Sequence, residues 1–135
     1  MTAPNDDELV ATDLYAFGSR AALREPRIDG YNLKAGQEPD LVVDEHGMIR
    51  PMEPPLGAST FADPSRVPLT GHYHRLPAGV RLPKGLGVRA DGIDVEGGTQ
   101  LPTHHTIYPT EPMRPDQFIR LLKSLPWEYG GKKWP

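Results

Sequence analysis

Prolines interrupt this chain so often that few windows remain in which a long helix fits. The 135 residues include 16 prolines and 14 glycines. Proline lacks an amide hydrogen and breaks helix interiors, so the prolines scattered between Pro26 and Pro115 argue against an all-helical bundle. We therefore predict a fold in which turns and short strands dominate.

Length and composition favour a single α+β domain that is held together by packing alone. A chain of 135 residues is long enough to bury one core and too short for two independent ones. Cysteine is absent, which excludes disulfides, a thiolate nucleophile and a cysteine-based zinc site. The formal net charge is -3 and no basic stripe is visible, which argues against affinity that comes mainly from nucleic-acid phosphates. We predict one domain over residues 1–135.

The N-terminus has the composition of a flexible leader, which we place at residues 1–8. This segment is acidic and polar, and it lacks the basic and apolar regions of a signal peptide. No apolar run along the chain is long enough to span a bilayer. We therefore expect a soluble protein that has no membrane partner and acts in the cytoplasm, with any export by a route other than a signal peptide.

Local patterns predict several short strands and one helix. Apolar residues recur at helical spacing between Pro115, which suits a first helical turn, and Pro126, which ends the helix. Beta-branched residues on both sides of Asp44–Gly47 indicate a hairpin. The aromatic tail after Pro126 is expected to fold back on the domain. Strands are predicted over residues 13–17, 41–43, 48–50, 72–76, 80–82, 86–89 and 103–109.

The segment Leu101–Met113 places hydroxyls and imidazoles on a short, proline-bounded strand. Side chains on a strand alternate between its faces. One face therefore carries His104, Thr106 and Tyr108, and the other carries Thr103, His105 and Ile107. Ile107 indicates the core side, which leaves His104 and Thr106 to line a cleft. The alternative is a half-buried strand whose imidazoles only bond to their neighbours.

Other kinds of site find weaker support in the sequence. His72 and His74 share a strand face, but no third metal ligand is identifiable, so no metal site is predicted. His104-His105-Thr106 matches the His-x-Thr element of two-histidine phosphoesterases, which need a second such element that this chain lacks. Ser59 lacks the Gly-x-Ser-x-Gly elbow of many serine hydrolases. Neither a dinucleotide fingerprint nor a Walker pattern occurs.

Three motifs, in this order, carry a resemblance to a known family. They are Leu14-Tyr15, Gly57-x-Ser59-x-Phe61, and Thr103-His104-x-Thr106-Ile107-x-Pro109-x-x-Pro112-Met113. Over roughly residues 13–125 the chain resembles the Tse-two toxins of bacterial type VI secretion, which look like ADP-ribosyltransferases. The last of the three motifs is the specific one.

The resemblance implies a small mixed fold in which two packed antiparallel sheets, with few helices, form a cleft for NAD. It also implies a cytotoxic effector that acts in the cytosol of a target bacterium on an unknown macromolecule and is opposed by an immunity protein. A secretion system would deliver it. The catalytic positions implied are His104 and Ser59. The positions implied to bind NAD are Tyr15, Ser59, Thr60, Phe61, His104 and Thr106.

Two positions depart from the family pattern. Ala16 stands where the family commonly has an arginine, and no glutamate lies within residues 103–109. Glu96 and Glu111 are the acidic candidates by proximity. Three alternatives to a transferase therefore remain: a non-catalytic binding module of the same fold, an NAD glycohydrolase, and a phosphodiesterase.

Overall fold

Short strands make up most of the regular structure, as the proline spacing predicts. The computed structural model describes residues 6–134. Two 3-10 helices, Asp6–Glu8 and Pro64–Arg66, accompany the main elements. In chain order these elements are β1 (Leu14–Gly18), β2 (Ile28–Asp29), β3 (Leu41–Val42), β4 (Ala58–Phe61), β5 (Gly71–Leu76), β6 (Leu86–Ala90), β7 (His104–Pro109), α1 (Pro115–Lys123) and β8 (Glu128–Lys133).

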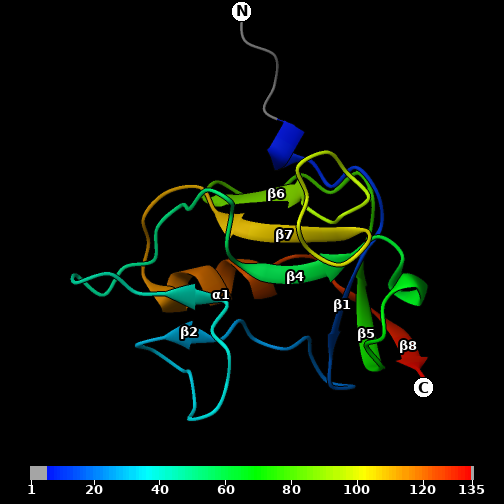
Figure 1. Ribbon diagram of the computed structural model, residues 1–135, viewed down its shortest axis with the longest axis horizontal. Coiled ribbons are helices and arrows are strands. Elements are labelled where there is room, and N and C mark those ends of the chain that lie inside the picture. Colours follow the sequence, from blue (N-terminus) through cyan, green and yellow to red (C-terminus); the bar gives the residue numbers. More distant parts are fainter. Residues whose placement is uncertain (1–5, 135) are drawn as a thin grey trace, which may run out of the picture.

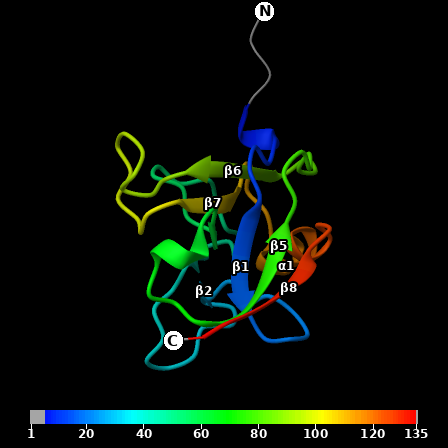
Figure 2. The same cartoon turned by 90° about the vertical axis from the view of Figure 1, so that its right-hand side faces the viewer.

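Six of the strands form one antiparallel sheet in the order β6-β7-β4-β1-β5-β8, and β2 and β3 form a small parallel sheet. β1 pairs with β4 through a single register match, Tyr15 with Phe61. The six-stranded sheet therefore has two halves, and their strands run across one another (Figure 1). Figure 2 shows β1, β5 and β8 side by side in one half. The predicted α+β class is confirmed, but the two separate sheets expected are halves of one sheet.

The core lies between one face of this sheet and the apolar side of α1. The helix begins at Pro115 and its buried side chains include Phe118, Ile119 and Leu122. The predicted helix is thereby confirmed. In the described part of the chain, no helix is both long and apolar enough to cross a membrane. The core residues that the sheet supplies include Leu14 and Ala16 of β1, Ala58 of β4, Leu76 of β5, Val88 of β6 and Ile107 of β7.

The hairpin predicted around Asp44–Gly47 forms only its turn. The Asp44 carboxylate accepts hydrogen bonds from the amides of His46 and Met48 at 2.8 and 3.0 Å. The bond from the Met48 amide is the main cause that lowers the pKa of Asp44 to about 2. The flanking segments pair elsewhere, because β3 lies beside β2 and Ile49 bridges to Met113.

One predicted strand does not form, and the two ends of the described chain pack onto the sheet. Residues 80–82 form no strand, and only a bridge joins Arg81 to Leu9. On the side away from β1, β5 pairs with β8, so the aromatic tail folds back on the domain as predicted. Of the predicted flexible leader, residues 1–5 lie outside the described residues. Its remainder lies in a 3-10 helix, and Asp7 there accepts a hydrogen bond from the Tyr108 hydroxyl.

Candidate functional site

The pairing of β4 with β7 brings two of the sequence motifs together. Ser59 lies opposite Thr106, and Phe61 lies opposite His104. Residues directly opposite on antiparallel strands point to the same face of a sheet. Ile107, on the other face of β7, is fully buried in the core. The alternation predicted for β7 therefore holds, and these four motif residues share the face away from α1.

Two hollows adjoin at Ser59. One lies on this face and has Ser59, His104 and Thr106 in its lining, together with Asp40 and Gln100. The other lies where β1 and β4 separate, and core-side residues such as Ala16 and Ala58 also line it. Ser59 lines both hollows. Other residues that line the second hollow include Phe17, Arg24, Phe61, Leu69 and Trp127.

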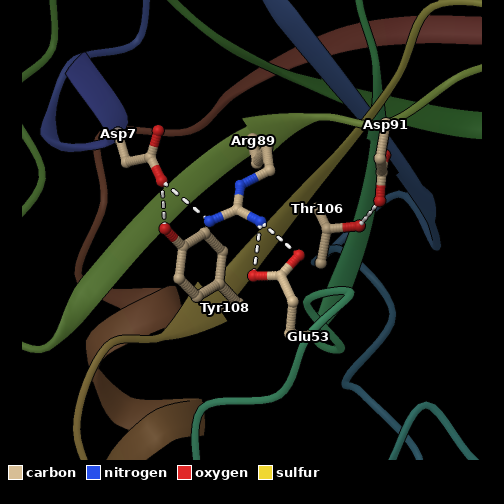
Figure 3. Close-up of polar contacts among 6 residues, drawn as sticks. All are labelled: Asp7, Glu53, Arg89, Asp91, Thr106 and Tyr108. Atoms are coloured by element: carbon tan, nitrogen blue, oxygen red, sulfur yellow. Dashed lines mark hydrogen bonds and ion pairs between the residues drawn. The ribbon is translucent and has the colours of Figure 1, made fainter. Parts of the chain in front are cut away.

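His104 is hydrogen-bonded to the carboxylate of Asp91, which no sequence motif points to. Its Nδ1 lies 2.5 Å from Oδ1 of Asp91. The Thr106 hydroxyl donates to the other oxygen, Oδ2, also at 2.5 Å (Figure 3). The Phe61 ring packs edge-on against the imidazole with 5.2 Å between ring centroids. No described residue hydrogen-bonds to Nε2 of His104, so this nitrogen is the one available to a ligand.

His104 and Thr106 line a hollow, as predicted, but both side chains are largely covered. Their exposed fractions are only 6% and 4%. The cover comes from the segment after β6, which carries Asp91, and from Pro55 and Leu56, which line the same hollow. The site is therefore a walled hollow, and Ser59 is its most exposed motif residue.

The strand register explains why Asp91 belongs to this site. Ala90 of β6 lies opposite His105 of β7, so the next residue along β6 comes opposite His104. The Asp91 amide also donates to the His104 carbonyl oxygen at 3.0 Å. The sequence does indicate strands over residues 86–89 and 103–109 with a turn after Ala90. The sequence patterns do not show that these two strands pair with each other.

Thr60 lines the second hollow with Ser59 and Phe61, but its hydroxyl does not face a ligand. It points to the opposite face, is fully buried, and donates its hydroxyl to the His105 carbonyl oxygen at 2.9 Å. The Thr60 hydroxyl is therefore used inside the sheet and is not available to donate a hydrogen bond to NAD.

We expect Thr60→Val to lower the free energy of unfolding by about 1 kcal/mol, because it removes one internal hydrogen bond and keeps the side-chain shape. Urea unfolding would measure this change. Ser59→Ala is the matched control, since an exposed hydroxyl is removed and stability should stay within about 0.5 kcal/mol of the wild type. A Thr60→Val protein as stable as the wild type would contradict the assigned bond.

Tyr15 lies beside Phe61 in the sheet but belongs to another hollow. Its ring packs edge-on against Tyr73 with 5.7 Å between centroids. The hollow it lines includes Arg75 and Glu128, which form an ion pair at 2.5 Å. The structure therefore does not bring Tyr15 together with His104.

The charged groups at the site differ from those considered in the sequence. Glu111 lines a separate hollow near Gly85, and the exposed Glu96 lines neither hollow at the site. The carboxylate that lines the surface of the His104 hollow is that of Asp40, which forms an ion pair with Arg24 at 3.3 Å. Ala16 faces the core and is 4% exposed, so an arginine there would be buried. Arg24 is thus the basic side chain that lines the hollow beside Ser59.

A cluster around Arg89 holds one wall of the site in place (Figure 3). Its guanidinium donates to both carboxylate oxygens of Glu53 at 2.9 and 3.0 Å, and it lies 3.5 Å from the Asp7 carboxylate. It also lies 5.5 Å from the centre of the Tyr108 ring. Burial, assisted by the hydrogen bond to Asp7, raises the pKa of Tyr108 to about 12. Glu53 lies just before Pro55 and Leu56, which line the His104 hollow, so its ion pair with Arg89 links this segment to β6.

The two histidines of β5 also have hydrogen-bond partners within the chain. His72 Nδ1 lies 2.8 Å from the Tyr129 hydroxyl, and His74 Nε2 lies 2.8 Å from the Ser19 carbonyl oxygen. Within residues 6–134, no group of three or more histidines and carboxylates is placed to hold a metal ion.

These residues can hold a polar ligand by several kinds of contact. An imidazole nitrogen and the Ser59 hydroxyl suit sugar hydroxyls or an amide, and Arg24 suits an anion. The Phe61 ring is 3% exposed and supports the imidazole from behind. No protein-family model matches this chain, and a comparison with curated proteins likewise finds no match.

Proposed function

We propose that this chain is an NAD-dependent, ADP-ribosyltransferase-like cytotoxic effector that acts in the cytosol of a target bacterium and is opposed by an immunity protein. The supporting observation is the placement of Ser59, Phe61 and His104 around two hollows that adjoin at Ser59. These residues come from two segments that are distant in the sequence and adjacent in the sheet.

The hollows suit the parts of a nicotinamide dinucleotide. Arg24 is a cation for a phosphate, and the buried Phe61 ring supplies an apolar wall beside it. NAD supplies a nicotinamide leaving group and, as that bond breaks, an electron-poor ribose carbon. Rigid contacts from His104 and Ser59 to the ribose or amide would hold the reacting bond in place.

Hydrolysis of NAD is the second candidate, and the burial of His104 favours it. His104 is 6% exposed and sits behind Leu56 and Gln100, which line the same hollow. Water reaches such a position more easily than a side chain of a large acceptor protein does. A glycohydrolase would therefore use the same residues with water as the acceptor.

Purified protein incubated with NAD and a bacterial lysate would test both candidates by mass spectrometry. Nicotinamide together with ADP-ribose attached to protein would support transfer. Nicotinamide with free ADP-ribose would support hydrolysis. Binding of NAD in calorimetry without either product would identify a binding module, and the absence of binding would contradict the proposal.

A further inference from the structure

We infer that Asp91 is a positioning residue, which fixes the tautomer and orientation of His104 so that the Nε2 lone pair faces the ligand hollow. Its importance for turnover rests on the proposed function. The imidazole tautomer does not rest on that function and can be measured by itself.

The hydrogen bonds of Asp91 define the proton positions at the site. A carboxylate oxygen accepts hydrogen bonds, so the contact of Oδ1 with His104 requires the proton on Nδ1. In a neutral imidazole the other nitrogen then carries a lone pair. His104 therefore presents Nε2 as an acceptor, which can take a hydrogen bond from a ribose hydroxyl or a water molecule.

Thr106 supports Asp91 and does not itself contact the ligand through its hydroxyl proton. Its hydroxyl proton is used in the bond to Oδ2, so it is not available for donation to a ligand. Thr106 lies two residues from His104 on the same face of β7, and its bond holds the carboxylate plane beside the imidazole. The ligand contact expected of Thr106 is therefore replaced by a supporting contact to Asp91.

The imidazole is held from both sides. Asp91 lies at the end of β6, on one side of β7, and the Phe61 ring contacts the imidazole from β4, on the other side. The Asp91 side chain is 13% exposed and the His104 side chain 7% exposed, so little water competes for their bond. A charge-assisted bond in such surroundings is stronger than one at the surface.

Asp91→Asn tests this role because an amide can donate as well as accept a hydrogen bond. The amide therefore permits the tautomer with the proton on Nε2, which cannot accept from a ligand hydroxyl. Loss of the carboxylate from comparable carboxylate–histidine pairs lowers activity by about 10- to 10⁴-fold. We expect a fall of that size in kcat for NAD consumption, with a much smaller change in KM.

Long-range nitrogen-15 NMR of the imidazole would give the tautomer independently of activity. In the wild type, Nε2 of His104 should be the unprotonated nitrogen, and in Asp91→Asn the Nε2-protonated form should become detectable. His74 is an internal reference of opposite tautomer, since its Nε2 donates to the Ser19 carbonyl oxygen. Thr106→Val, which keeps the carboxylate, should give a smaller loss of turnover and serves if Asp91→Asn does not fold.

The results separate this inference from the proposed function. A wild-type His104 with its proton on Nε2 would overturn the role of Asp91, whatever the activity. Unchanged kcat in both folded variants would overturn it as well. If the wild type has the expected tautomer but consumes no NAD, the proposed function fails while the positioning of His104 by Asp91 stands.

Discussion

His104→Ala is expected to abolish the growth arrest that the wild-type chain causes when it is expressed in the bacterial cytosol. The substitution removes the imidazole whose Nε2 is free to contact a ligand, and it leaves Asp91 without its main partner. Intracellular NAD should fall during wild-type expression and stay at the uninduced level with the variant. Growth curves and an NAD assay on the same cultures would measure both effects.

The controls separate loss of function from loss of fold. His46→Ala removes an exposed histidine in the turn after β3, and this variant should remain toxic. Because His104 is buried, its replacement also affects packing, so Ser59→Ala provides a second variant with an exposed side chain. Circular dichroism would show whether each variant is folded. Full toxicity of both folded site variants would rule out the assigned roles.

Gly57→Ala is expected to disrupt the attachment of β4 to β7 and to destabilise the whole fold. A Cβ atom at this position would lie 2.0 Å from the carbonyl oxygen of Ile107 and 3.0 Å from Cα of Tyr108. Both are backbone atoms of β7, which cannot move aside without breaking the pair between Ala58 and Ile107. We expect a loss of about 3 kcal/mol or more, at the upper end of overpacking costs. The corresponding fall in melting temperature is on the order of 10 °C.

Thermal and urea unfolding of the Gly57→Ala protein would measure this loss. Gly47→Asn is a suitable control. It adds a larger side chain where nothing lies within 4 Å, and asparagine tolerates a φ of +75° better than most residues. The control should stay within about 1 kcal/mol of the wild type. Equal stability of the two variants would show that β4 and β7 are not packed as closely as described.

The parts of the fold that depend on local pattern could be predicted well. The helix from Pro115, the strand that carries His104 and the strand before Ala90 follow from apolar spacing and from the prolines that bound them. Alternation also predicts that His104 and Thr106 share a face. The same rule, applied to Gly57-x-Ser59-x-Phe61, places Thr60 on the opposite face, so its burial could have been anticipated.

Pairing between distant segments could not be predicted in the same way. The turn at Asp44–Gly47 forms from local hydrogen bonds, but β3 pairs with β2, and Ile49 with Met113. A hairpin signal describes only the nearest available partner. The final partner depends on which arrangement buries the most apolar surface across the whole chain, and this is a property of the assembled core.

By itself, the sequence determined the short strands, the single helix and the face on which each motif residue lies, because these depend on neighbours within a few positions. Only the tertiary structure decided that Asp91 bonds to His104, that Arg89 pairs with Glu53 beside the segment containing Leu56, and that Ser59 lines two adjoining hollows. The physical reason is strand register. Each contact joins residues on different segments, and a shift of one position in pairing would turn every one of these side chains to the other face.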